Sequence, residues 1–377
     1  MRVGPTLVAL ALLAVACGGP GDDAALEDGG EPKFFWEIPG PDPESLVPLD
    51  EIVSGGPSPD GIPPIEEPRF IEPSHASWLD PQEPVLSLEV DGDARAYPLQ
   101  ILLWHEIVND TVGGRPVAVT YCPLCNSAIV FDRTVAGSVT TFGTSGRLYN
   151  SDLVMYDRET KSLWPQIMGK AVVGPRIGTE LEVIGSATTS FADFRTAHPG
   201  GKVLSRRTGF DREYGRTPYA GYDSTSDPFL FRGEVDPKLP AIARVVGVRT
   251  DEGAKSYAVD ALRALGPRAA INDAIGDLDL VVLFKRGTRS TLNTQLTANG
   301  RDVGSSGVFA RRLGSRLLTF TVRKDRFLDE QTGSTWDLFG RATAGPLHGK
   351  RLQALDKVDT FWFAWAVFVP DAPLWTG

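Results

Sequence analysis

The sequence predicts an α+β fold, mainly antiparallel and β-rich, with two internally duplicated lobes in one globular body. Two observations support this. Short apolar runs alternate with polar residues and end at turns, as in Val85–Val90 before Asp91-Gly92-Asp93. This period of two is typical of half-buried strands joined by hairpins. In addition, a set of residues from the first half of the chain recurs in the same order in the second half.

The recurrence is clearest around two tryptophans. Further matches follow the same order along the chain. The matched segments are Asp157, Thr160, Ser162 and Trp164 with Asp329, Thr332, Ser334 and Trp336; Ala94–Tyr97 with Ala254–Tyr257; and Asn109-Asp110 with Asn272-Asp273. We infer an internal duplication over roughly 85–210 and 245–375. Two long copies predict paired lobes, because a solenoid needs three or more shorter repeats.

Individual elements follow from the same patterns. Runs rich in β-branched and aromatic residues predict strands over 85–90, 117–121, 127–131, 139–142 and 153–156. Mixed apolar spacing predicts a short helix over 99–107. Two further helices are expected over 191–198 and 362–369, at corresponding places in the two copies.

The N-terminus is typical of an export signal. Arg2 precedes an apolar run over 7–16, which is too short to span a bilayer, since spanning needs about 20 residues. The run ends in Leu13-Ala-Val-Ala-Cys17, which resembles the lipobox of bacterial lipoproteins. We therefore expect residues 1–17 to be a lipoprotein signal peptide, with lipidation of Cys17. The alternative is an ordinary secretory signal, which would also export the chain.

The remaining chain divides by composition. Residues 18–45 are rich in Gly, Pro, Asp and Glu, so they bury too little apolar surface to offset their ordering entropy and are predicted to form a flexible tether. Residues 46–215 are expected to form the N-terminal lobe. A Pro-, Gly- and Tyr-rich connector over 216–245 leads to a degenerate C-terminal lobe over 246–377.

Charge limits the partners. The chain has 48 acidic and 38 basic residues, a formal charge of −10, and no basic run, so binding to a nucleic-acid backbone is not supported. We expect a globular body in the periplasm or on the cell surface, attached to a membrane through the N-terminal lipid. Its substrate, a small molecule or a protein, is not defined by the sequence.

If Cys17 is lipidated, two cysteines remain, Cys122 and Cys125. They lie between two predicted strands, and Asn126 after them tolerates the left-handed conformation that closes a tight turn. We therefore predict a hairpin tip rather than a thioredoxin-type motif, which begins a helix. Three roles are open: a structural disulfide, which would contribute only about 2 kcal/mol for so short a loop; a redox pair; or two thiolate ligands of a metal.

A metal site needs further ligands, and His105 upstream of the strand over 117–121 is the best candidate. A Cys2His set with an open position suits Zn²⁺ as a Lewis acid. Cu(I) would accept the same ligands with Met155. The alternatives are a buried histidine bonded to backbone and a methionine in the core. Glu106 is the expected proton shuttle or supporting partner.

Comparison of the two copies distinguishes candidate site residues from residues of the shared framework. Tyr121 aligns with Phe284, which places Cys122 on Lys285 and Cys125 on Thr288. The reactive residues are therefore unique to the first copy. Polar residues near Trp164 could also line a pocket; they are Asp152, Asp157 and Gln166. Because Asp157 recurs as Asp329, a turn or capping role is expected for it.

Several segments together carry a family resemblance. They are GGP at 55–57, DGIP at 60–63, GDARAYP at 92–98, WHEIVND at 104–110, YCPLC at 121–125, MYDRET at 155–160 and FWFAW at 361–365. The sequence resembles the domain-of-unknown-function family 3179 over about residues 50–375. Pro59 stands where that family usually has lysine. The resemblance implies an extracytoplasmic protein with a His/CPLC cluster and no established reaction.

Three functions are therefore expected to compete. The first is a Zn or Cu centre built from His105, Cys122 and Cys125, with Glu106 and the cysteines as the candidate catalytic groups. The second is a thiol–disulfide protein that uses the two cysteines. The third is a ligand-binding lipoprotein with purely structural cysteines.

Overall fold

The computed structural model describes residues 33–377, and it is 41 % strand and 12 % helix. Most of its strand pairs are antiparallel. These features confirm the predicted β-rich α+β class. The predicted signal peptide, the lipidation site Cys17 and the tether up to residue 32 lie outside the described residues.

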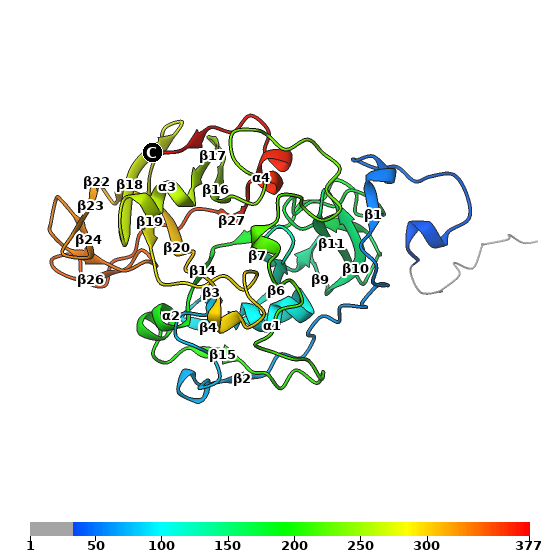
Figure 1. Cartoon of the computed structure of the whole chain (residues 1–377), viewed down its shortest axis with the longest axis horizontal. Helices are drawn as coiled ribbons and strands as arrows, with labels where there is room; N and C mark the ends of the chain where they lie inside the picture. Colours follow the sequence, from blue (N-terminus) through cyan, green and yellow to red (C-terminus); the bar gives the residue numbers. More distant parts are fainter. Residues whose placement is uncertain (1–32) are drawn as a thin grey trace, which may run out of the picture. The chain divides into compact units, whose positions relative to one another are not determined.

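The first half of the described chain supplies the strands of three sheets (Figure 1). In sheet order, the first sheet contains β14 (Ser186–Ser190), β3 (Pro84–Val90), β4 (Asp93–Pro98), β15 (Lys202–Leu204) and β2 (Phe70–Ile71). The second contains β13 (Val183–Ile184), β7 (Ser127–Asp132), β6 (Arg115–Cys122) and β5 (Ile107–Val112). The third contains β1 (Ile52–Ser54), β10 (Phe142–Tyr149), β11 (Asp152–Asp157) and β12 (Leu163–Pro165). Two helices and a small hairpin accompany them: α1 (Leu99–His105), α2 (Phe191–Ala197), β8 (Thr134–Val135) and β9 (Ser138–Val139).

The second half supplies a similar series. Its sheets contain β27 (Lys357–Phe361), β16 (Arg244–Thr250), β17 (Gly253–Ala258) and β28 (Leu374–Trp375); β18 (Arg268–Ile275), β19 (Leu278–Lys285) and β20 (Ser305–Ala310); β23 (Phe320–Arg323), β24 (Arg326–Asp329), β25 (Thr335–Trp336) and β26 (Ala342–Ala344); and the hairpin β21 (Arg312–Leu313) with β22 (Arg316–Leu317). The helices are α3 (Val259–Ala264) and α4 (Trp362–Phe368). Short 3₁₀ turns cover Phe35–Glu37, Leu49–Glu51, Pro73–His75, Tyr222–Ser224 and Thr297–Asn299.

Corresponding elements of the two halves pair in the same way. β3 pairs with β4 and β14, as β16 pairs with β17 and β27, and the parallel pair β4–β15 matches the parallel pair β17–β28. Asn109 exchanges two hydrogen bonds with the Phe142 backbone, each 2.9 Å, and Asn272 does the same with Phe320, each 2.8 Å. These matches are what a duplication predicts, and the duplication itself stays an inference.

The core does not divide at the predicted connector. Its largest apolar cluster joins Val119 and Phe131 of the first half to Val245, Phe361 and other residues of the second half. β27 lies beside β7, as Figure 1 shows. The described residues accordingly belong to one compact unit. Separate lobes with a boundary at 216–245 therefore stay a prediction.

Most predicted elements of the first copy are present, with one correction. The strand expected over 139–142 is interrupted, because β9 ends at Val139 and β10 begins at Phe142. Within the segment expected as a tether, Phe34 is buried, 5 % exposed, against Tyr156 and Val172, and the tether over 18–45 stays a prediction. The apolar Phe34 gains enough burial there to offset its ordering, which the average composition of 18–45 concealed. Among the described helices, none is long and apolar enough to cross a membrane.

Candidate metal centre

The two cysteines lie where the sequence predicted, in the tight turn between β6 and β7. Cys122 ends β6 and pairs with Ser127 at the start of β7. The turn closes through a 3.2 Å hydrogen bond from the Asn126 N–H to the Pro123 carbonyl, with Asn126 at φ 53°. Asparagine adopts this left-handed conformation more readily than most residues. Residues 122–126, which we call the CPLC turn, are therefore a hairpin tip.

A second hairpin brings a carboxylate to this turn. Asn150 and Ser151, at φ 50° and 67°, connect β10 to β11, and Asp152 follows as the first residue of β11. The Cys122 and Cys125 thiols donate to the Ser151 carbonyl, at 3.8 and 3.6 Å. The two sulfurs and a carboxylate oxygen of Asp152 all lie within 4.8 Å of one another. This cluster could hold a metal ion.

Asp152 is held rigidly but is only partly satisfied. Its side chain is fully buried, and one carboxylate oxygen accepts a 2.9 Å hydrogen bond from the Ile167 N–H. The other oxygen makes no hydrogen bond of ordinary geometry with a described residue. Burial raises the pKa of Asp152 to about 7, although the nearby Cys125 thiol and Leu153 N–H lower this pKa in part. A carboxylate oxygen in this situation is available to a cation, because leaving it charged and unpaired is costly.

The cysteines share this apolar environment. Cys122 and Cys125 are 1 % and 0 % exposed, and their sulfurs are not joined in a disulfide. Burial raises the pKa of the Cys125 thiol well above its ordinary value. The charge of Arg249 lowers the pKa of Asp152 slightly, and its Nη1 donates to the Ile167 carbonyl at 2.8 Å. The acidic groups of the cluster thus lack a directly bonded positive charge.

His105 does not join this cluster, which corrects the expected Cys2His set. Its Nδ1 is 2.7 Å from the Pro63 carbonyl and its Nε2 is 2.6 Å from the Tyr214 hydroxyl. A carbonyl can only accept, so Nδ1 carries the hydrogen and Nε2 accepts from the tyrosine. Burial lowers the His105 pKa to about 4. Both ring nitrogens are therefore occupied, and Asp152 is the third member of the cluster instead.

Glu106 points to a different environment from its neighbour His105. Glu106 is the residue that follows α1 and caps its C-terminus, at φ 57°, and its N–H donates to the Leu102 carbonyl at 2.7 Å. The side chain is 7 % exposed and makes no hydrogen bond to a described residue. Burial, with a contribution from Asp152, raises the Glu106 pKa to about 8. Glu106 is thus a buried acid that keeps its proton near neutral pH, close to the cluster but outside its ligand set.

A cavity of about 520 Å³ adjoins the cluster and is lined by Glu106. Leu124 from the CPLC turn and Leu153, next to Asp152, form part of its wall. Tyr219 and Tyr222 from the predicted connector also line it. Burial raises the pKa of both phenols, with smaller contributions from Glu106 and Cys122 at Tyr219 and from the two cysteines at Tyr222. We call this space the Tyr219 cavity. Its volume lies within the range of small-molecule sites.

The other side of the CPLC turn rests on the second half of the chain. The Cys125 carbonyl accepts two hydrogen bonds from β27, at 2.9 Å from the Phe361 N–H and 2.8 Å from the Thr360 hydroxyl. Thr360 is fully buried. The half without the reactive residues therefore positions one of the two thiols.

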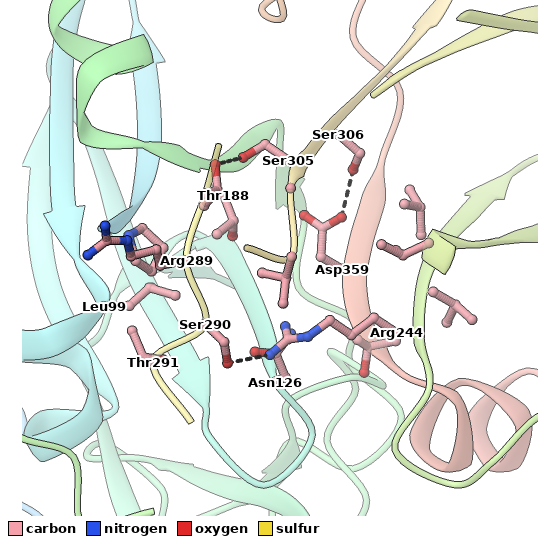
Figure 2. A pocket seen from close by; sticks show the side chains of 18 of the residues that line it. Leu99, Asn126, Thr188, Arg244, Arg289, Ser290, Thr291, Ser305, Ser306 and Asp359 are labelled. Carbon is pink, nitrogen blue, oxygen red and sulfur yellow. Dashed lines mark hydrogen bonds between the residues drawn. The ribbon is translucent and has the colours of Figure 1, made fainter. Parts of the chain in front are cut away.

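A small chamber of about 40 Å³ lies at the same junction, lined by polar and apolar residues that include Tyr121 and Asn126 of the first half (Figure 2). Figure 2 also shows Arg244 from β16 donating to Ser290, at 2.9 Å, and Ser306 bonded to Asp359 of β27, at 2.6 Å. A chamber of this size holds about three waters at most. It is part of the contact that holds the CPLC turn rather than a substrate site.

The remaining polar residues singled out in the sequence have structural partners. Asp157 accepts from the Thr160 N–H at 2.7 Å and from the Trp164 ring N–H at 3.0 Å, which confirms its turn role. Gln166 bonds to Ser127 and Thr120 at the base of the CPLC turn. Only Asp152 of the three contributes to the cluster. The connector tyrosines were missed because no sequence spacing links them to the cysteines.

The fold and the cluster together define a β-rich α+β protein with a buried dithiol–carboxylate centre beside a cavity. The chain belongs to the family described as Protein of unknown function (DUF3179), whose match spans residues 59–372. This confirms the resemblance seen in the sequence. Comparisons with curated proteins and with solved structures found no match.

Proposed function

We propose that this protein is an extracytoplasmic lipoprotein in which Cys122, Cys125 and Asp152 hold a zinc ion beside the Tyr219 cavity. The carboxylate of Asp152 carries the proposal. It is fully buried, one oxygen makes no hydrogen bond of ordinary geometry with residues 33–377, and it lies within 4.8 Å of both sulfurs. A divalent cation at this point would compensate three acidic groups that form no direct ion pair with a side chain of residues 33–377.

The ligand chemistry favours zinc over copper. Thiolate and carboxylate are both ordinary zinc ligands, whereas Cu(I) prefers sulfur and imidazole. The imidazole of His105 is bonded elsewhere. Met155 stands an odd number of positions from Asp152 on β11, so it faces the opposite side of the strand and packs in the main core. Neither His105 nor Met155 is therefore placed to complete a copper site with the two cysteines.

The arrangement also favours a metal centre over thiol–disulfide exchange. Exchange requires an accessible thiolate. Both sulfurs are buried, and burial raises the pKa of Cys125. Metal binding does not require an exposed sulfur, and the positive ion itself favours the thiolate form.

Three protein ligands leave one position of a tetrahedral zinc ion for water or substrate, where the metal acts as a Lewis acid. Glu106 faces the Tyr219 cavity with its proton retained near neutral pH. It is thus suited to give a proton to, or take one from, a molecule bound there. Tyr219 makes no side-chain hydrogen bond to a described residue and leaves its hydroxyl free for that molecule. We propose metal-assisted chemistry on a small molecule in this cavity.

The proposed location rests on the sequence, with Arg2, the apolar run over 7–16 and Cys17 as its basis. The mass of the N-terminal peptide from membrane fractions tests it. An acylated Cys17 is the expected product, and an unmodified peptide beginning elsewhere would contradict the anchor.

Metal analysis of the chain that begins after Cys17 tests the centre. We expect about one zinc per chain, lost in Cys122→Ser, because two ligands bind zinc far more weakly than three. Lys285→Ser, at the corresponding position of the second half, is the matched control and should retain the metal. A metal-free protein that cycles between dithiol and disulfide would contradict the proposal, as would a permanent disulfide.

Thr360→Val should weaken zinc binding about tenfold, because it removes one of the two hydrogen bonds that hold the Cys125 backbone. Competition with a chelating dye measures the change. Thr189→Val is the matched control: Thr189 lies at the corresponding place in β14, is fully buried, and its hydroxyl has no partner among the described residues. Equal zinc affinities for the two variants would show that β27 does not position the ligand.

A further inference from the structure

Arg147 is the basic side chain in the lining of the Tyr219 cavity. It lies on β10 and is half-buried. It forms no ion pair with a carboxylate of residues 33–377. Burial lowers its guanidinium pKa, and no acidic neighbour acts in the opposite direction. A cation placed in a largely apolar wall without a counter-charge is a common feature of sites that bind anions.

The contacts of the guanidinium group leave one edge available. Its carbon lies 4.1 Å from the centre of the Trp36 ring, and Nη1 donates to the Ile52 carbonyl at 3.3 Å. Nε and Nη2 have no acceptor among the described residues. These two N–H groups form a planar fork that matches the two oxygens of a carboxylate. Stacking on Trp36 holds the Arg147 guanidinium in place, so the side chain loses little conformational entropy when it pairs with a carboxylate.

The rest of the wall is mainly apolar, with Ile62, Leu148, Leu153 and Phe229 among its residues. The register of β10 and β11 relates Arg147 to the cysteine cluster. Arg147 pairs with Val154, and Tyr149 pairs with Asp152. Positions two residues apart on a strand are about 7 Å apart along it. A small molecule held by Arg147 could therefore extend along the apolar wall toward Glu106 and the cluster.

We propose that the Tyr219 cavity binds a small organic acid, an apolar body with one carboxylate, and that Arg147 pairs with this carboxylate. The proposal deepens the proposed function, since it names the class of molecule presented to the metal. The binding itself depends on Arg147 and the apolar wall, not on the zinc ion. The two proposals can therefore fail separately.

Naphthalene-2-carboxylate and naphthalene-2-carboxamide are suitable probes, because they share size and shape and differ in charge. Calorimetric titration of the chain that begins after Cys17 should show the carboxylate binding about tenfold more tightly than the amide. Arg147→Met should remove this preference and leave amide binding unchanged. Arg316→Met, at an exposed position of β22, is the control and should keep the preference.

Zinc content separates this result from the metal proposal. Arg147→Met should retain about one zinc per chain, and Cys122→Ser should keep the carboxylate preference even without metal. Equal affinities of wild-type protein for the two probes would overturn the inference. So would a preference that survives Arg147→Met, or failure of both probes to bind up to their solubility limits.

Discussion

Replacing Glu106 with glutamine should stabilise the metal-free protein at pH 8 by about 3–5 kcal/mol. Burial and Asp152 raise the Glu106 pKa from 4.5 to about 8 in the folded protein. At pH 8 the unfolded chain has lost this proton, whereas the fold must either retain it or bury a charge. Glutamine has nearly the same shape and no proton to lose, so it avoids the penalty.

The direction of the pH dependence follows from the same shift. At pH values between the Glu106 pKa of the unfolded chain and that of the folded protein, the native state binds more protons than the unfolded state. The free energy of unfolding therefore falls as pH rises. Asp152, with its pKa raised from 3.8 to about 7, acts in the same direction. His105 acts oppositely, since its lowered pKa of about 4 costs stability as pH falls below 6.5. Between pH 6.5 and 8 the two carboxyl groups outweigh His105, which in the unfolded chain loses its remaining proton in the same interval.

Urea unfolding in the presence of a chelator at pH 6.5 and 8 measures this effect. The wild-type protein should lose stability over the interval, and Glu106→Gln should lose less. Glu67→Gln, at an exposed position, should behave as wild type. In the metal-loaded protein the trend should reverse, because zinc competes with the same protons and binds more tightly as pH rises. If the loss of stability between pH 6.5 and 8 were the same in Glu106→Gln as in the wild type, Glu106 would not be a buried, protonated carboxyl group.

Replacing Asp157 with alanine should lower the free energy of unfolding by about 3–5 kcal/mol. The Asp157 side chain is fully buried and accepts from the Thr160 N–H, the Thr160 hydroxyl and the Trp164 ring N–H. Alanine leaves these donors without partners in a dry environment. It also leaves Arg176, whose Nε is 3.8 Å from the carboxylate, without its buried counter-charge.

The second half of the chain supplies a matched variant. Asp329 makes the same bonds to Thr332 and Trp336 but has no arginine partner within the described structure. Asp329→Ala should therefore destabilise by a similar but smaller amount. Glu159→Ala removes only the exposed ion-pair partner of Arg176 in the same turn and should change stability by less than about 1 kcal/mol. If Asp157→Ala were as mild as Glu159→Ala, these recurring residues would not be framework.

Local features were predicted well because local physics sets them. The alternation in β3 and the apolar run of β7 each appear as strands within a residue or two of the expected bounds. The CPLC turn was predicted as a hairpin tip because Asn126 favours the left-handed conformation that it adopts. The burial of Phe34 was not predicted, because the composition of 18–45 was averaged over the whole segment.

Only two of the three members of the cluster were predictable. Cys122 and Cys125 are close in sequence, and their spacing indicated a shared site. Asp152 reaches them through the β10–β11 hairpin, whose docking depends on long-range contacts that leave no spacing signal. His105 was assigned to the cluster because the strand over 117–121 could return the chain from the cysteines to it, but its two ring nitrogens bond to Pro63 and Tyr214 instead. His105 instead meets Tyr214, over a hundred residues away in the sequence.

The sequence by itself therefore determined the fold class, the family and the turn that carries the two thiols, because alternation, turn chemistry and motifs are written in neighbouring residues. It also predicted which recurring residues are framework, as Asp157 and Trp164 illustrate. Only the tertiary structure decided that Asp152 completes the cluster, that β27 holds Cys125, and that Arg147 lines the adjoining cavity. Each of these contacts joins segments whose proximity depends on the packing of whole sheets, so no local pattern could reveal it.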